Sequence, residues 1–236
     1  MSNQYYESGE RRAERVQDLF GDIARRYDLI NDLQSFGLHR VWKRKLAQLA
    51  SVNHGMRALD VCCGTGDIVF ALRNCAAMVV GLDFSVPMLR IALQRRRAPK
   101  DGILFIQGDA QQLPFADNLF DAVTVGYGLR NLASWERGLE EIWRVAKPGG
   151  RLLVLDFGKP PNALWRVIYF GYLRCAVPLF GRLFCKNAPA YAYILESLRH
   201  YPAQQGIAAH MHKLGCHDVR VINLVGGAMS INAGVK

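Results

Sequence analysis

The fold of this 236-residue chain is decided by the stretch Leu59-Asp60-Val61-Cys62-Cys63-Gly64-Thr65-Gly66-Asp67. The run from Arg57 to Val61 predicts a short buried strand, and Gly64 and Gly66 allow a tight turn before helical spacing of apolar residues resumes. Asp83 ends the next apolar run. Strand, glycine turn, helix, strand and acid, in this order, are typical of an open α/β sheet that binds a nucleoside.

The turn lacks the third glycine of a dinucleotide site, because Val69 stands where G-x-G-x-x-G requires it. Asp67 would repel a pyrophosphate and suits a cationic cofactor, through a sulfonium or an amino group. Asp83 lies 19 residues after Gly64, close to the spacing of an acid that accepts hydrogen bonds from ribose hydroxyls. Taken singly, these acids have structural alternatives, since Asp60 can end a strand and Asp83 can cap a helix. Together they indicate an adenosine-bearing cofactor.

Length and composition indicate one α/β domain with a large core, since half of the residues are apolar. The N-terminus lacks the apolar region of a secretory signal. Six cysteines show neither C-x-x-C nor zinc-type spacing, which predicts reduced thiols in a cytosolic protein. The net charge of +10 favours anionic partners, nucleic acid or a membrane face, although each basic cluster alone fits a solvated helix face.

Apolar runs and helical spacing alternate along the chain and predict a parallel sheet covered on both faces. The strands are expected at residues 57–61, 78–83, 103–107, 120–126 and 151–157. Helices are expected between them at 66–74, 86–97 and 135–146, and before them at 11–26 and 39–50. Residues 219–224 and 228–235 flank a Gly-Gly pair and predict a closing hairpin.

An apolar, aromatic-rich segment from Leu164 to Phe184 separates the fifth strand from that hairpin. Arg166, Arg174 and Arg182 argue against a membrane-spanning helix, and Pro178 is expected to interrupt any continuous helix. A buried core helix is one interpretation. The preferred one is a two-part amphipathic lid that covers a greasy substrate or rests on a membrane surface.

Two polar segments are candidates for the substrate end of the site. Residues 27–42 combine hydrogen-bonding tips with aromatic bodies, which suits a planar, oxygenated ring, and His39 fits a substrate contact and a helix start equally. The loop 126–132 follows the fourth strand, where ligands bind in doubly wound sheets. There Arg130 could hold a developing phenolate and Asn131 a ring oxygen; a structural ion pair is the alternative for Arg130.

Four stretches resemble the motifs of class I methyltransferases that use S-adenosylmethionine, namely residues 59–67, 108–115, 120–123 and 145–152. The resemblance implies a Rossmann-like α/β fold with a seven-stranded, mostly parallel sheet and an antiparallel last strand. Nucleobase methyltransferases of this class share a Pro-Pro-aromatic turn after the fourth strand. That turn is absent here, which counts against nucleic acid as the acceptor.

Nearly the whole chain resembles one family of this class, the UbiE/MenG quinone C-methyltransferases. The matching residues are Tyr27, Asp28, Asn31, Asp32, Ser35, His39, Trp42, 128–131, 144–145, 147–150, Phe157, 178–181 and 191–197. The paired cysteines at 62 and 63 are more similar to the menaquinone branch than to the ubiquinone branch. The resemblance implies C-methylation of a prenylated naphthoquinol, converting demethylmenaquinol to menaquinol. The alternatives are a benzoquinol or phytyl-naphthoquinol substrate, a basic RNA-binding module without activity, and a dehydrogenase.

The resemblance also implies S-adenosyl-L-methionine as cofactor and no metal. Its contacts fall on Thr65, Asp83, Asp109, Ala110 and Gly126, to which the turn itself adds Asp60, Gly64 and Gly66. The expected catalytic residues are Arg130, Asn131, His39, Tyr127 and Asp28. Arg130 would stabilise a phenolate, Asn131 and His39 would orient the ring, and Tyr127 would pack on it. His39, Asp28 or a water near Arg130 would take the proton that the ring carbon loses.

We therefore expect a single methyltransferase domain over residues 1–236, with N-terminal helices within 11–50 and a lid-like insertion at about 160–200. The expected partners are a prenylated quinol and an anionic membrane surface, without nucleic acid; a homodimer is left open. The expected location is the cytoplasm, peripherally at the inner face of the membrane. The departures from the family pattern, which leave the exact quinone open, are Ile30, Ala146, Asp156, Gly158, Asn232 and Val235.

Overall fold

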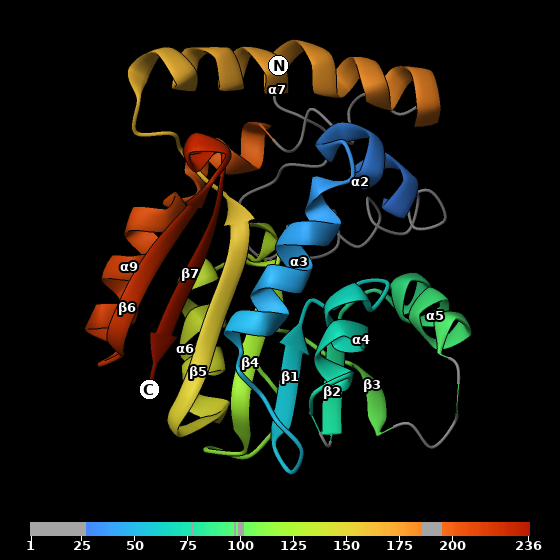
Figure 1. The fold of residues 1–236 in the computed structure, drawn as a ribbon, viewed down its shortest axis with the longest axis vertical. Coiled ribbons are helices and arrows are strands. Elements are labelled where there is room, and N and C mark those ends of the chain that lie inside the picture. Colours follow the sequence, from blue (N-terminus) through green and yellow to red (C-terminus); the bar gives the residue numbers. More distant parts are fainter. Residues whose placement is uncertain (1–26, 77, 97, 99–101, 186–194) are drawn as a thin grey trace.

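A computed structural model describes residues 27–76, 78–96, 98, 102–185 and 195–236. The helix expected at residues 11–26 lies outside the described residues. Seven strands form one sheet in the order β3-β2-β1-β4-β5-β7-β6 (Figure 1). They are β1 (Arg57–Val61), β2 (Met78–Asp83), β3 (Ile103–Gln107), β4 (Phe120–Gly126), β5 (Ala146–Phe157), β6 (His217–Leu224) and β7 (Met229–Val235).

The sheet is parallel from β3 to β5, and β7 pairs antiparallel with both β5 and β6. This confirms the predicted seven-stranded, mostly parallel α/β sheet. After β1 the chain adds strands on one side, and after β3 it crosses back to place β4 on the other side of β1. The order therefore reverses between β1 and β4. In open α/β sheets ligands bind beyond the carboxyl ends of the strands at such a point.

Helices cover both faces of the sheet, as the alternating pattern predicts (Figure 1). Along β1, Leu59 and Val61 join the core that includes Leu139 of α6, whereas Ala58 joins the core that includes Leu46 of α3. Successive strand residues point to opposite faces. The described helices are α2 (Tyr27–Ser35), α3 (Leu38–Leu49), α4 (Asp67–Arg73), α5 (Val86–Arg95), α6 (Trp135–Val145), α7 (Ala163–Cys185) and α9 (Ala203–Lys213).

The expected break at Pro178 is wrong, because α7 runs through it as one helix. Proline removes the hydrogen bond to the carbonyl of the residue four positions earlier, here the exposed Arg174. Water can reach that carbonyl at the surface. The helix is held in place because Tyr169, Leu173 and Val177, at successive turns, are all buried. Within the described part of the chain, no helix is both long and apolar enough to cross a bilayer.

Candidate active site

A pocket of about 780 Å³, open to solvent, lies at the carboxyl ends of β1, β2 and β4. It brings together sequence positions from four separate loops. Seven of the expected site residues line it, namely Gly64, Asp83, Asp109, Ala110, Gly126, Tyr127 and Asn131. Cys62, Phe84, Ser85, Met88 and Gln111 also line it.

The glycine turn lets the pocket reach the backbone. Gly64 and Gly66 have φ values of 54° and 89°, which side chains disfavour. A Cβ at Gly66 would stand 2.9 Å from Cε2 of Phe70, and one at Gly126 would stand 2.5 Å from Cδ1 of Ile68. Larger residues at these two positions would therefore have to displace side chains of α4.

Asp83 braces the turn and faces the pocket at once. Its Oδ2 accepts a hydrogen bond from the Gly64 N–H at 2.7 Å, and its Oδ1 accepts one from the Ser85 N–H at 2.8 Å. Burial raises the pKa of Asp83, while these backbone donors lower it. Asp83 can therefore brace the turn and bind a ligand at the same time. A carboxylate has about four acceptor positions, so these backbone donors leave capacity for a ribose hydroxyl.

Asp60 lies behind the turn and is not among the residues that line the pocket. Its Oδ1 accepts a hydrogen bond from Thr124 Oγ1 at 2.7 Å, and burial raises its pKa to about 7. Its Oδ2 has no hydrogen-bond partner among the described residues. A buried carboxylate oxygen without a donor fits a cationic or N–H-bearing group of a ligand.

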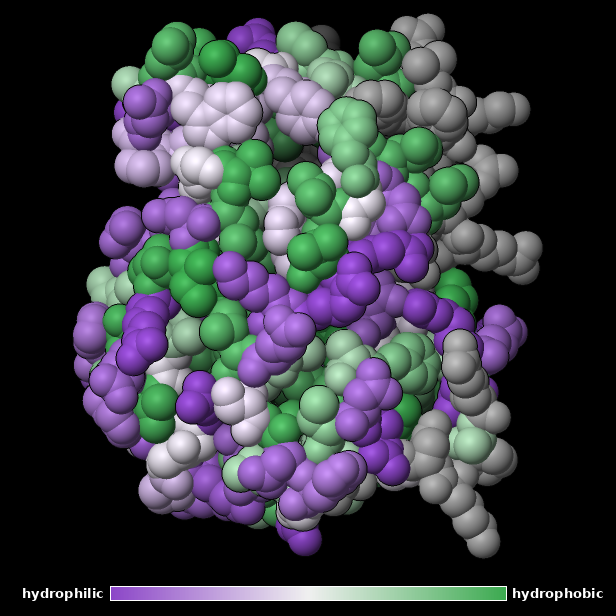
Figure 2. All heavy atoms as spheres, in the orientation of Figure 1, coloured by the Kyte–Doolittle hydropathy of each residue, from purple (hydrophilic) through white to green (hydrophobic). Residues whose placement is uncertain are grey.

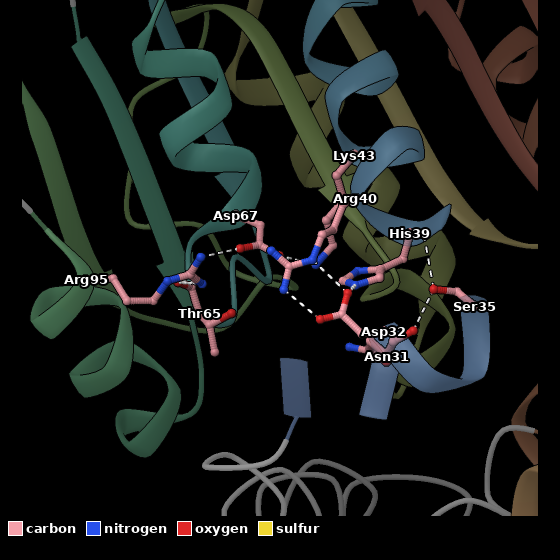
Figure 3. Close-up of polar contacts among 9 residues, drawn as sticks. All are labelled: Asn31, Asp32, Ser35, His39, Arg40, Lys43, Thr65, Asp67 and Arg95. Atoms are coloured by element: carbon pink, nitrogen blue, oxygen red, sulfur yellow. Dashed lines mark hydrogen bonds and ion pairs between the residues drawn. The ribbon is translucent and has the colours of Figure 1, made fainter. Parts of the chain in front are cut away.

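The expectation that Asp67 offers its charge to the cofactor is corrected by the structure. Its Oδ2 is 2.8 Å from Lys43 Nζ and its Oδ1 is 2.6 Å from Arg95 Nη2 (Figure 3). Burial acts to raise the pKa of Asp67, but these cations outweigh it and hold the pKa at about 2. Arg95 also donates to the Thr65 carbonyl at 2.8 Å. Neither Asp67 nor Thr65 is among the pocket-lining residues.

The loop after β4 holds Arg130 in the ion pair that the sequence left as its alternative. Arg130 Nη1 lies 2.9 Å from Asp156 Oδ1, both side chains are buried, and the guanidinium stands 4.7 Å from the Phe157 ring centroid. Nη1 also donates to the Tyr127 carbonyl at 2.6 Å. Asp156 balances the charge of Arg130, so this pair holds the loop in place. The assignment of Arg130 as the phenolate-stabilising group stays a prediction.

Asn131 is the polar group of that loop that faces the pocket. Its Nδ2 donates to the Tyr127 carbonyl at 3.0 Å, and its Oδ1 lacks a hydrogen-bond partner within the described residues. Tyr127 lines the pocket with a φ of 63°, and its ring packs edge-to-face on Phe157. A strained non-glycine residue at a strand end is often tied to function.

The segment 27–42 forms α2 and the start of α3, which lie between the strand ends and α7 (Figure 1). His39 is 2% exposed and its Nε2 is 2.8 Å from Asp32 Oδ1 (Figure 3). It is not among the pocket-lining residues, and the side chain of Asp28, on α2, lies outside the description.

Sequence reasoning missed four charged residues that hold the site together. They are Asp32, Lys43, Arg95 and Asp156. Asp156 carried the clearest signal, because it differs from the family pattern and stands in β5, the strand that follows the loop that it anchors. The others stand in helices, where a charged residue alone predicts a solvated face.

The residues present fit S-adenosylmethionine. Asp83 offers acceptor positions for ribose hydroxyls, and Asp109 and Ala110 line the wall next to it. A Cβ built on Gly64 would meet nothing within 4 Å, so the backbone there is open to a ligand. These features suit the nucleoside part of the cofactor.

Solved structures share this fold. A SAM-dependent methyltransferase from Thermotoga maritima is 19% identical, with a TM-score of 0.66, over 93% of this chain and 99% of its own. An N-methyltransferase from Haemonchus contortus, solved with S-adenosylhomocysteine, has a TM-score of 0.61 at 17% identity, over 81% of this chain and 51% of its own. These likenesses show that the chain has the fold of the methyltransferases in these solved structures.

Relatives that are similar in sequence identify the family of methyltransferases to which the chain belongs. The ubiE/COQ5 methyltransferase family model matches residues 8–236. A demethylmenaquinone methyltransferase of Desulfitobacterium hafniense is 41% identical over 97% of this chain and 92% of its own length. A ubiquinone/menaquinone biosynthesis C-methyltransferase of Azotobacter vinelandii is 39% identical over 95% and 91%. The chain belongs to the ubiE/COQ5 methyltransferase family and is a C-methyltransferase.

Proposed function

We propose that the protein methylates a ring carbon of a prenylated naphthoquinol, converting demethylmenaquinol to menaquinol. The observation that carries this proposal is Asn131, an acceptor-loop residue that lines the same pocket as Asp83 and has an unpartnered Oδ1. The relative from Desulfitobacterium hafniense and the paired cysteines at 62 and 63 support the naphthoquinol ring. The relatives named for ubiquinone and menaquinone together support a benzoquinol as the second candidate.

The chemistry requires a reduced acceptor. S-adenosylmethionine supplies a methyl group made electrophilic by its positively charged sulfur. A quinol ring carbon becomes nucleophilic when a neighbouring hydroxyl loses its proton, whereas an oxidised quinone ring is electron-poor. The work left to the chain is to bind both reactants in line and to accept a proton.

Each expected catalytic residue has a part in this proposal. Asn131 Oδ1 accepts a hydrogen bond from a ring hydroxyl at the pocket, and the Tyr127 ring packs on the acceptor. Arg130 fixes the loop through Asp156 and the Tyr127 carbonyl. His39 orients the ring from α3. The proton acceptor is His39, Asp28 or a water near Arg130.

We propose that the hydrophobic, prenylated substrate reaches the protein from a membrane surface. Figure 2 shows apolar residues gathered over the end of the molecule that α7 and α2 form. Leu164 and Val167 of α7 are 72% and 71% exposed, and Phe36, after α2, is 82% exposed. Arg166 and Arg174 on α7 are exposed as well, and the chain carries a net charge of +10. An apolar face with basic residues suits anionic lipid.

Vesicle binding tests this part of the proposal. We expect the protein to sediment with vesicles that contain an anionic lipid, and less so as salt rises. The variant Val167→Ser should reduce binding, while the matched variant Leu104→Ser, at a 49% exposed position on the edge strand β3, should not. Absence of binding at low salt would reject the membrane surface and leave α7 as an internal cover.

The function is tested by methyl transfer to defined acceptors. Purified protein, S-adenosylmethionine and a short-chain demethylmenaquinol should give menaquinol, with a higher kcat/KM than a demethylated benzoquinol gives. Omitting the reductant should abolish turnover, because the oxidised ring is a poor nucleophile. Turnover with the benzoquinol alone would replace the proposal by the second candidate, and turnover with neither ring would reject both.

A further inference from the structure

Three buried polar atoms of α2 and α3 have no hydrogen-bond partner among the described residues. They are Asn31 Nδ2, Gln34 Nε2 and His39 Nδ1. Two are amide donors and the third belongs to a ring that is 2% exposed. Buried polar groups are nearly always paired in native proteins, and each unpaired one calls for an explanation. Donors and an acceptor on one pair of helices suit a ligand that carries a hydroxyl group.

The hydrogen bonds of His39 determine which of its nitrogens is basic. Asp32 Oδ1 lies 2.8 Å from His39 Nε2, and Arg40 Nε and Nη2 bind the two oxygens of Asp32 at 2.7 Å each. The Arg40 guanidinium holds the pKa of Asp32 well below its usual range, so its carboxylate is ionised and can only accept. The proton of a neutral His39 therefore sits on Nε2, and Nδ1 presents its lone pair.

Hydrogen bonds at the junction of α2 and α3 hold the backbone that carries His39. Ser35 Oγ donates to the Asn31 carbonyl at 2.5 Å and accepts from the His39 N–H at 3.2 Å (Figure 3). Tyr172 Oη of α7 donates to the Gln34 carbonyl at 2.8 Å, and this hydrogen bond joins α7 to α2. The three unpartnered atoms therefore lie on α2 and α3, whose positions are set by contacts with each other and with α7.

His39 also lies on the side of α3 that faces the pocket. His39 and Lys43 are one turn apart and both are buried, so they share the inner face of the helix. Lys43 Nζ stands 5.9 Å from the centroid of the Tyr127 ring, and Tyr127 lines the methyl-donor pocket. In this inference the acceptor ring lies against Tyr127, on the side of α3 that carries Lys43 and His39.

We propose that His39 Nδ1 is the atom that takes the proton of the acceptor's ring hydroxyl, with Asp32 as its positioning residue and Asn31 as a donor to the ring oxygen. The inference rests on the proposed quinol methylation and deepens it. As the O–H bond breaks, its electrons move into the ring, the ring carbon bonds to the methyl carbon, and the methyl–sulfur bond breaks with its electrons on sulfur. The ring carbon's hydrogen then leaves to water as a proton, and His39 returns its proton to the ring oxygen. One proton is released overall.

The charged groups around His39 predict a pH profile. Burial and Lys43 lower the pKa of His39 below its ordinary 6.5, whereas Asp32 and Asp67 raise it. The neutral, basic form therefore dominates at pH 7, and the rate should fall only as the pH drops through the lowered pKa. Replacing Asp32 should move that fall to lower pH, and replacing Lys43 should move it to higher pH.

The test measures kcat and kcat/KM against pH with reduced acceptor. His39→Asn should lower kcat about 10²–10⁴-fold and remove the fall of the rate at acidic pH. The Kd for S-adenosylmethionine, measured by calorimetry, should change by no more than about twofold, because His39 does not line the methyl-donor pocket. Asp32→Asn and Lys43→Met should shift the fall in opposite directions. The matched control His54→Asn, at an exposed histidine, should change neither quantity.

A second measurement avoids any variant that fails to fold. The nitrogen spectrum of His39 in the wild-type protein should show a bare Nδ1 and a protonated Nε2 at pH 7. A protonated Nδ1, or a folded His39→Asn variant that keeps the wild-type profile, would overturn the inference and leave Nδ1 as a structural water site. Wild-type protein that methylates no quinol at any pH would instead reject the proposed function.

Discussion

The methyl-donor side and the acceptor side of the site are assembled from different parts of the sequence. The donor side comes mainly from one strand-turn-helix-strand segment, residues 57–85, and Asp83 is braced by Gly64 and Ser85 within it. The acceptor side joins α2, α3, the loop after β4 and α7, through pairs such as Arg130 with Asp156 and Tyr172 with Gln34. Local backbone geometry builds the first side, and long-range contacts build the second.

The difference predicts how each side fails. Loss of one acceptor-side charge leaves a buried partner charge uncompensated, so the whole fold should weaken. Loss of a donor-side acid removes ligand contacts at the end of a strand that stays in its sheet, so cofactor binding should weaken more than the fold. The predictions that follow test this contrast, beginning with the largest expected effect.

Asp156→Asn should destabilise the protein by about 3–5 kcal/mol, because it leaves the Arg130 guanidinium buried without its counter-charge. Urea unfolding measures the change. The double variant Arg130→Met with Asp156→Asn should lose less than the single one. Asp117→Asn, which breaks a pair at a 66% exposed carboxylate, should cost at most about 1 kcal/mol. Equal losses in the two single variants would remove the contrast between buried and surface pairs.

Asp83→Asn should weaken S-adenosylhomocysteine binding about 10²-fold, since a charged acceptor of hydrogen bonds contributes about 1.5–3 kcal/mol. Calorimetric titration gives the Kd directly. The control is Asp218→Asn, at an exposed position distant from β2, and it should bind as the wild type does. If Asp83→Asn unfolds the protein while binding remains intact in the folded fraction, the acid is a structural brace alone.

Asp67 connects the two sides, and its charge should contribute about 2 kcal/mol of stability near neutral pH, as the shift of its pKa from 3.8 to about 2 implies. Its pKa is lowered in the folded state, so this contribution is present above pH 3.8 and lost as the pH falls towards 2. The difference in unfolding free energy between wild type and Asp67→Asn should therefore shrink from pH 6 to pH 3. A difference that stays constant over this range would contradict the assigned ion pairs.

The smallest effect is expected on the outer face of α7. Val167→Ser, at a 71% exposed position, should change the unfolding free energy by at most about 0.5 kcal/mol. Leu173→Ala on the inner face of the same helix, 2% exposed, should cost about 2–5 kcal/mol. Thermal or urea unfolding of both variants decides whether α7 is anchored by its inner face alone.

Much of the fold followed from pattern. The strands predicted at 57–61, 78–83, 103–107 and 120–126 match the structure, because a buried strand needs a short apolar run and little else. The fifth strand begins earlier than predicted, at Ala146, since Ala146 pairs with Phe120 ahead of a register shift. The break predicted at Pro178 does not occur, because packing of α7 outweighs the local cost of proline in a helix.

The site was predictable where one segment builds it. Gly64 and Asp83 were found from spacing, and both line the pocket. Asp67 was misassigned because its partners, Lys43 and Arg95, come from helices on either side of it in the sequence. The basic atom of His39 could not be found from the sequence, because it follows from a hydrogen bond to Asp32 across the break between two helices.

The sequence by itself determined the parallel sheet, the glycine turn and the acid at the end of β2, since these depend on backbone conformation and on periodic burial. Only the tertiary structure decided which charges neutralise each other. Arg130 pairs with Asp156, and Lys43 and Arg95 share Asp67. Electrostatic energy depends on distance and on burial, and neither quantity is encoded in the spacing of residues along a chain.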